Sequence, residues 1–295
     1  MSDQADMLRQ LVRSREGPAP PPEPPPIPTA RSLVFTSGKG GVGTSNLALN
    51  LAIALGEKGQ RVALVDADFG LANLDLLCGL APGCDLGDVL AGGRPLSDAI
   101  VPGPGDIRIL PGAHGTRTMA DVLAEAPKRL AKELAELEAG TDFLLIDAGS
   151  GLGPSISTIA SAADCLVLVT TPEPTSVADA HASLRRLNRN TVLRVVVTQA
   201  QSNAEGNDCL ERIAASSRQF LGMVVSPLGF LRFDPHVPQA VRMRKPFLTA
   251  YPNAPVSRGV RRLAETLLDE RCPRPPRPGF FTSLAARWAL GRVAS

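Results

Sequence analysis

The glycine-rich stretch at residues 37–45 (SGKGGVGTS) is the strongest chemical signal in the sequence, because an apolar run precedes it and a helical pattern follows it. Glycines here let successive backbone N–H groups turn toward phosphate oxygens, and the start of the helix adds the positive end of its dipole. The stretch therefore predicts a P-loop rather than a glycine-rich turn without a ligand. The residues expected to bind nucleotide are Gly38, Lys39, Gly40, Gly41, Val42, Gly43, Thr44, Ser45 and Asn46.

Acidic residues follow two other apolar runs. Asp66 and Asp68 come at the end of the second run, and Asp147 ends the fourth. A carboxylate beside a P-loop can hold Mg²⁺ through water, and another can orient an attacking water. The candidate metal-site residues are therefore Ser45, Asp66 and Asp147, although aspartates at strand ends also serve as helix N-caps.

One P-loop position departs from the pattern G-x-x-x-x-G-K-[ST], because Thr44 stands where the lysine is expected. That lysine offsets negative charge on the β- and γ-phosphates, which is a large part of phosphoryl-transfer catalysis. A neutral hydroxyl cannot replace it. We therefore expect slow hydrolysis, or nucleotide binding without hydrolysis, unless Lys39 compensates in cis or in trans.

Short apolar runs alternate with helical patterns along the body of the chain, and several runs are apolar on both faces, as buried parallel strands are. The predicted strands are residues 32–37, 61–65, 107–110, 143–146, 165–169, 193–197 and 223–228. The predicted helices between them are residues 46–58, 120–138, 176–188 and 205–221. This order predicts a doubly wound α/β fold with a mostly parallel sheet and helices on both faces.

Proline and charge divide the chain. Eight of the 27 prolines lie in residues 18–28 and four more in residues 273–278, and such clusters predict stiff spacers. Residues 271–295 hold five arginines and no acid although the whole chain has a net charge of +2, so the remainder is acidic and is not expected to bind nucleic acid directly. The predicted units are a short docking helix at 1–16, a linker at 17–30, a nucleotide-binding domain at 31–270, a linker at 271–279 and an amphipathic helix at 280–295.

The last of these segments has one apolar face. Phe280, Phe281, Leu284 and Trp288 share a sector of the helical wheel, and arginines flank it. This composition suits a helix lying at an anionic membrane surface. The alternative is a helix that docks back on the body through the same face.

No signal points away from the cytoplasm. No apolar run is long enough to span a bilayer, and the first six residues do not resemble a signal peptide. The five cysteines are scattered and form no Cys-x-x-Cys pair, which favours free thiols in a reducing compartment. We expect a cytoplasmic protein that associates reversibly with the inner face of the cell membrane.

Several motifs resemble the MinD/ParA ATPases with a deviant P-loop, and within them the FlhG/FleN branch that regulates flagellar number and placement. The similarity begins with GKGGVG (38–43) and VDADFGLANLD (65–75) and continues through LLIDAGSGLG (144–153) and TTPEPTSVADA (170–180). It extends to LGFLRFDPHVPQAVRMRKPF (228–247) and YPNAPVSRGVRRLAETL (251–267), so it covers about residues 31–270.

The resemblance implies roles for individual residues. It makes the protein an ATPase that uses Mg²⁺ and forms an ATP-sandwiched homodimer, in which Lys39 reaches the partner's nucleotide. Asp68 would lie in switch I and position the hydrolytic water, and Asp147 would coordinate Mg²⁺ indirectly. Switch II would follow with Gly149 and Gly151.

Two further positions depart from the family pattern. Thr198 stands where an asparagine usually reads the adenine, and Arg232 stands where a proline is usual. The P-loop therefore predicts nucleotide binding, while these two departures leave the identity of the base open.

The N-terminal segment is similar to the DQAxxLR motif with which FlhG proteins contact the GTPase FlhF. The matching residues are Asp3, Gln4, Ala5, Leu8 and Arg9. The resemblance also implies that the C-terminal helix targets the membrane.

Three functional hypotheses remain from the sequence. The first is a nucleotide-switched ATPase that dimerises, binds membrane and regulates a flagellar GTPase. The second is a pseudo-ATPase adaptor that holds nucleotide as a structural ligand. The third is a ParA-like partitioning ATPase, for which the acidic body is poor support.

Overall fold

An eight-stranded sheet lies at the centre of the computed structural model, which describes residues 30–68, 72–90, 94–112, 128–151, 154–187, 191–269 and 278–291. The strands are β1 (Arg31–Ser37), β2 (Val62–Asp66), β3 (Val101–Pro102), β4 (Arg108–Leu110), β5 (Phe143–Ser150), β6 (Cys165–Thr170), β7 (Leu193–Ala200) and β8 (Val225–Arg232). Their order is β3-β4-β2-β5-β1-β6-β7-β8, and β3–β4 is the one antiparallel pair among these described strands. The seven predicted strands and the doubly wound class are confirmed, whereas the apolar runs do not predict the two-residue β3.

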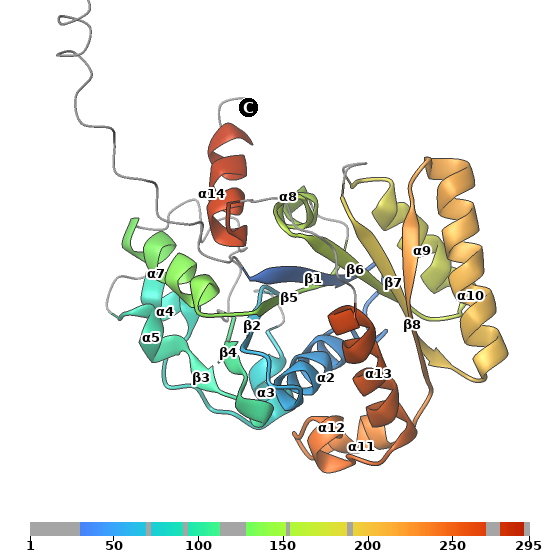
Figure 1. Cartoon of the computed structure of the whole chain (residues 1–295), viewed down its shortest axis with the longest axis horizontal. Helices are drawn as coiled ribbons and strands as arrows, with labels where there is room; N and C mark the ends of the chain where they lie inside the picture. Colours follow the sequence, from blue (N-terminus) through green and yellow to red (C-terminus); the bar gives the residue numbers. More distant parts are fainter. Residues whose placement is uncertain are drawn as a thin grey trace, which may run out of the picture.

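Helices cover both faces of this sheet (Figure 1). One face carries α4 (Leu86–Leu90), α5 (Leu96–Ala99), α7 (Lys128–Ala139), α8 (Pro154–Ala162), α9 (Pro174–Leu184), α10 (Asn203–Ser216) and α14 (Phe280–Gly291). The other face carries α2 (Thr44–Glu57), α3 (Leu74–Cys78), α11 (His236–Arg242), α12 (Phe247–Ala250) and α13 (Pro255–Asp269). Two short turns, η1 (Pro104–Asp106) and the π-helical η2 (Ser217–Leu221), complete the described elements.

The predicted helices are present, with different ends. The pattern at 205–221 becomes α10 followed by η2, and the pattern at 176–188 becomes α9. Residues 120–127 and 188 lie outside the described residues, so the ends of two predictions stay open. The sequence patterns used here do not predict α13, although Val256, Val260 and Leu263 form an apolar face that is buried against the sheet.

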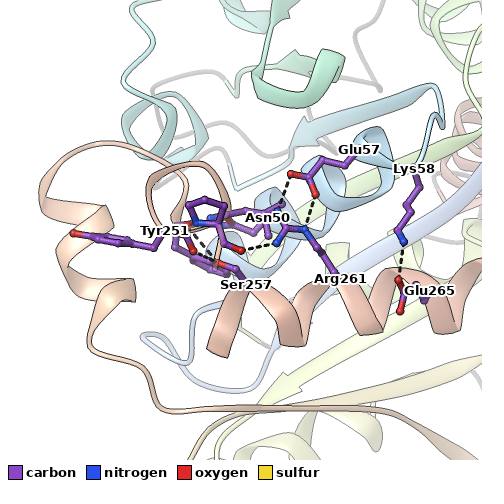
Figure 2. Close-up of polar contacts among 10 residues, drawn as sticks. Asn50, Glu57, Lys58, Tyr251, Ser257, Arg261 and Glu265 are labelled. Carbon is purple, nitrogen blue, oxygen red and sulfur yellow. Dashed lines mark hydrogen bonds and ion pairs between the residues drawn. The ribbon is translucent and has the colours of Figure 1, made fainter. Parts of the chain in front are cut away.

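The first helix after the P-loop, α2, is fixed to the C-terminal part of the chain by polar contacts (Figure 2). The side-chain amide of Asn50 is fully buried. Its Oδ1 accepts a hydrogen bond from the backbone N–H of Leu248 at 2.8 Å. At the exposed end of α2, Arg261 donates to both carboxylate oxygens of Glu57, and Lys58 pairs with Glu265 at 2.6 Å. α12 and α13 are therefore held in a defined position relative to the P-loop helix.

The C-terminal helix α14 packs against α7 and α8 through its apolar face. Phe280, Phe281 and Leu284 are 2%, 3% and 0% exposed. Glu138 on α7 accepts hydrogen bonds from the backbone N–H groups of Phe280 at 2.6 Å and Phe281 at 3.3 Å, and burial raises the pKa of this carboxyl. The structure thus shows the docked alternative, and the predicted membrane-binding face is not available in this conformation.

The side chain of Trp288 lies outside the described residues, as do residues 1–29 and the linker residues 270–277. No helix in the described part of the chain is both long enough and apolar enough to cross a bilayer.

We predict that Asn50→Ala lowers the free energy of unfolding by about 1–3 kcal/mol, because the buried N–H of Leu248 loses its acceptor. Urea denaturation measures this change. The matched control is Lys58→Ala, just after the same helix, which breaks an exposed ion pair and should cost less than about 1 kcal/mol. Equal effects of the two substitutions would contradict the role assigned to Asn50.

Candidate nucleotide-binding site

The P-loop lies between β1 and α2, at the carboxyl ends of the parallel strands. It borders a cavity of about 510 Å³. Gly40, Gly41, Gly43, Thr44, Ser45 and Asn46 line the cavity from the P-loop side, and Asp68, Gly149 and Ser150 line it from the ends of β2 and β5. The structure therefore brings together the P-loop and two of the predicted acidic segments. A cavity of this size at strand ends is typical of a small-molecule site.

Three glycines shape the loop for different reasons. A Cβ on Gly38 would overlap the backbone of Asp179 in α9, so this glycine permits close packing of the loop on that helix. Gly41 and Gly43 have φ angles of 82° and 90°, in the left-handed region, and a Cβ there would meet nothing within 4 Å. Their conformation turns the backbone, as a phosphate cradle requires.

The side chain of Ser45 connects the P-loop to β5 through a hydrogen bond to the carboxyl of Asp147. Asp147 is 1% exposed, and its Oδ1 also accepts from the N–H of Gly149 at 3.1 Å. Burial raises the pKa of Asp147 to about 6. Because buried carboxylates are usually paired or bound to a metal, a serine hydroxyl backed by this group fits a Mg²⁺ site in which phosphates and water supply the other ligands.

Within the described ranges, no group of three or more His, Cys, Asp or Glu side chains could hold a metal ion. The donor set here fits Mg²⁺ only together with a nucleotide.

Asp66 lies at the end of β2, as predicted, but it does not face the cavity. It is 1% exposed, and its oxygens accept hydrogen bonds from the N–H groups of Asp68, Asn73 and Leu74 at 3.1, 3.0 and 3.2 Å. Burial and the neighbouring Asp147 raise the pKa of Asp66 to about 7. Asp66 therefore holds the start of α3 in position, which is the capping alternative, rather than facing a metal directly.

Asp68 borders the cavity and lies against Gly149, near the end of β5. A Cβ on Gly149 would overlap the Asp68 carboxylate, so Gly149, with a φ of 67°, is required for this approach. Gly151 has a φ of 130° and donates from its backbone to the carbonyl of Ser37 at 3.0 Å. The two segments expected to act as switches therefore contact each other beside the P-loop.

Lys39 points away from this cavity. Its Nζ lies 2.9 Å from Oε2 of Glu173, and both side chains are well exposed at 43% and 63%. Lys39 does not line the cavity, so it does not compensate for Thr44 in cis in this conformation.

A second cavity of about 440 Å³ adjoins the first and shares Gly41, Gly43 and Asn46 with it. Thr198 is 6% exposed, and its hydroxyl lies 2.7 Å from the carbonyl of Val42 and 3.2 Å from that of Thr170. The hydroxyl of Thr198 therefore hydrogen-bonds to the P-loop backbone and is not available to bind a base. Arg232 lines the same cavity and donates to the carbonyl of Gln201 at 3.4 Å.

Two residues at these cavities have no role in the sequence-based prediction. Gln199, with a φ of 58°, donates its side-chain amide to the carbonyl of Gly41 at 3.1 Å. Arg244, with a φ of 51°, lines the P-loop cavity from the segment after α11. The similarity at residues 228–247 covers Arg244 but assigns it no function.

The candidate partner-binding residues Asp3, Gln4, Ala5, Leu8 and Arg9 lie outside the described residues.

Comparison with known proteins agrees with this geometry. Residues 33–247 match the model of the CobQ/CobB/MinD/ParA nucleotide binding domain. Antiactivator FleN of Pseudomonas aeruginosa is 35% identical over 83% of this chain and 89% of its own. The flagellum site-determining protein YlxH of Helicobacter pylori is 30% identical over 92% of both chains.

A solved structure of the septum site-determining protein MinD of Pyrococcus horikoshii, complexed with Mg-ADP, has a TM-score of 0.64. It is 27% identical and covers 82% of this chain and 96% of its own. The P-loop, the acidic strand ends and these relatives lead to one conclusion: the chain belongs to the CobQ/CobB/MinD/ParA family of nucleotide-binding domains.

Proposed function

We propose that this protein is a MinD-like ATPase that binds ATP with Mg²⁺, hydrolyses it slowly, and uses the bound state to regulate flagellar number or placement. The observation that carries the proposal is the Ser45–Asp147 hydrogen bond beneath a glycine cradle that opens on a cavity. The relatives support it, since one is named a flagellum site-determining protein and another was solved with Mg-ADP.

The residues divide the chemistry among them. Backbone N–H groups around Gly41 and Gly43 would bind phosphate oxygens, and Ser45 would contribute a ligand oxygen oriented by Asp147. When bound, Mg²⁺ supplies charge neutralisation on the β- and γ-phosphates. Asp68, at the cavity wall, would orient the attacking water. Thr44 contributes no positive charge, which accounts for the slow turnover that we propose.

Formation of an ATP-sandwiched homodimer is the second part of the proposal. Lys39 is exposed, and its ion pair with Glu173 is of the kind that contributes about 0.2–1 kcal/mol. A second copy carrying nucleotide could therefore draw Lys39 away at little cost. In such a dimer Lys39 would supply charge to the partner's phosphates in trans.

Reversible membrane association is the third part. The apolar face of α14 would reach an anionic membrane only after it leaves α7 and α8, because Phe280, Phe281 and Leu284 are buried there. Arg287 is exposed on the same helix and would contact lipid phosphates. The N-terminal segment, with Asp3, Gln4, Ala5, Leu8 and Arg9, would dock to an FlhF-type GTPase.

A second candidate function follows from Thr44. A neutral side chain at the P-loop lysine position, together with a Lys39 that is paired elsewhere, suits a pseudo-ATPase adaptor. Such a protein would hold nucleotide without hydrolysing it and would act through its two ends.

ATP turnover separates these two candidates. We predict slow hydrolysis by the full-length wild type that rises with anionic vesicles and protein concentration, because dimerisation brings Lys39 to the partner's site. Thr44→Lys is expected to hydrolyse ATP faster at low concentration. If the wild type shows no turnover with or without vesicles while Thr44→Lys does, the adaptor is supported.

Vesicle sedimentation tests the membrane proposal. We predict that the full chain with ATP sediments with anionic vesicles and that residues 1–270 do not. Arg287→Glu should bind these vesicles less than the wild type, since an exposed positive charge near the lipid is reversed. The matched control is Arg218→Glu, an exposed arginine on η2, which should bind as the wild type does. Equal sedimentation of full-length and truncated protein would contradict membrane binding through α14.

A further inference from the structure

The P-loop cavity lacks a positive charge at the position where the P-loop pattern has a lysine. Thr44 is neutral, and the Nζ of Lys39 lies against Glu173 outside the cavity. Acidic groups, in contrast, are abundant, since Asp68 lines the cavity and Asp66 and Asp147 lie just behind it. A nucleotide would bring further negative charge into this environment, so a cation of the chain that acts in addition to Mg²⁺ would favour its binding.

Arg244 is the one cationic side chain among the described residues that line the cavity. It lines the same space as Thr44 and Asp68, although about two hundred residues of sequence separate it from the P-loop. No hydrogen bond or ion pair joins its guanidinium to any described residue, so its five donors are not committed to this part of the fold.

The backbone around Arg244 is held firmly relative to the P-loop helix. A Cβ on Gly79 would lie 2.8 Å from the carbonyl oxygen of Arg244, so the end of α3 packs closely against it. The N–H of Arg244 donates to the carbonyl of Val241 at 3.0 Å. Four residues later, the backbone N–H of Leu248 donates a hydrogen bond to the buried side chain of Asn50 in α2, the helix that begins with Thr44.

This fixed backbone includes an unusual conformation. Arg244 has a φ of 51°, which costs energy for a residue other than glycine. Such conformations persist only where the surrounding structure imposes them, and they gather at ligand sites. Here the C-terminal turn of α11 imposes it, since the N–H of Lys245 donates to the carbonyl of Ala240 at 3.1 Å, and the Arg244 side chain lines the cavity.

We propose that Arg244 binds the nucleotide phosphates in cis and supplies the positive charge that Thr44 does not. A guanidinium stays protonated at all relevant pH values and can donate two parallel hydrogen bonds to a phosphate. The inference rests on the proposed nucleotide binding and adds to it: the same chain, without a second copy, compensates for its altered P-loop. Arg244 then contributes to binding in the monomer, whereas Lys39 would act only between subunits.

Equilibrium titration with a fluorescent ATP analogue and with the matching ADP analogue, each with Mg²⁺, tests the proposal on the full-length chain. Arg244→Gln removes the charge, and we expect it to weaken binding of both analogues by about 10- to 100-fold, as loss of a charged hydrogen bond does. Arg244→Lys should retain most of the affinity. The matched control is Lys245→Gln, which removes the neighbouring exposed cation; Lys245 lines neither cavity, so this variant should bind as the wild type does.

A double substitution makes the test specific. If Arg244 replaces the missing lysine, then Thr44→Lys should restore affinity to the Arg244→Gln protein, while it should add less to the wild type. Arg244→Gln affinity equal to that of the wild type overturns the role of Arg244 and leaves nucleotide binding intact. Absence of binding by the wild type itself overturns the proposed function, so the two failures are distinguishable. Thermal denaturation without nucleotide shows whether each variant is folded.

Discussion

The hydrogen bond between Ser45 and Asp147 is the interaction on which the site depends. It joins the start of α2 to the end of β5 and keeps a buried carboxyl beside the P-loop. Asp66 lies next to Asp147 on the neighbouring strand, and burial raises the pKa of both groups. Two acidic groups this close in the interior are stable because backbone amides and a hydroxyl solvate them, and a divalent cation at Ser45 would favour the ionised form of Asp147.

Few positive charges in the described part of the chain lie near this pair of buried aspartates. A P-loop lysine would normally lie near them, and Thr44 removes that charge. Among the described residues that line the cavity, Arg244 is the one cation, whereas Lys39 is exposed and pairs with Glu173 outside the cavity. In the proposal above, Arg244 acts within one subunit and Lys39 between two. The docking of α14 on α7 and α8 is a separate feature, because its apolar face is buried there and could meet a membrane, as proposed above, only after it leaves these helices.

Much of the fold could be predicted from local patterns, because buried parallel strands are continuous apolar runs and a P-loop has a recognisable order of glycines. The functions of Asp66 and of α14 could not be predicted from such patterns. An aspartate at a strand end faces either a metal or backbone amides, and only the path of the following loop decides between them. Likewise, the apolar face of α14 fits lipid or protein equally well, and its partner here is set by the surfaces of α7 and α8. Arg244 could not be identified from the sequence either, because it lies far from Thr44 along the chain and only the fold brings the two residues to the same cavity.

The central claim is that Ser45 and Asp147 hold Mg²⁺ together with a nucleotide. Calorimetric titration of the full-length protein with ATP, once with Mg²⁺ and once with excess chelator, tests it most directly. We predict that ATP binds markedly more tightly with Mg²⁺ and that Ser45→Ala removes most of this difference. Equal affinity for ATP with and without Mg²⁺ in the wild type would contradict it.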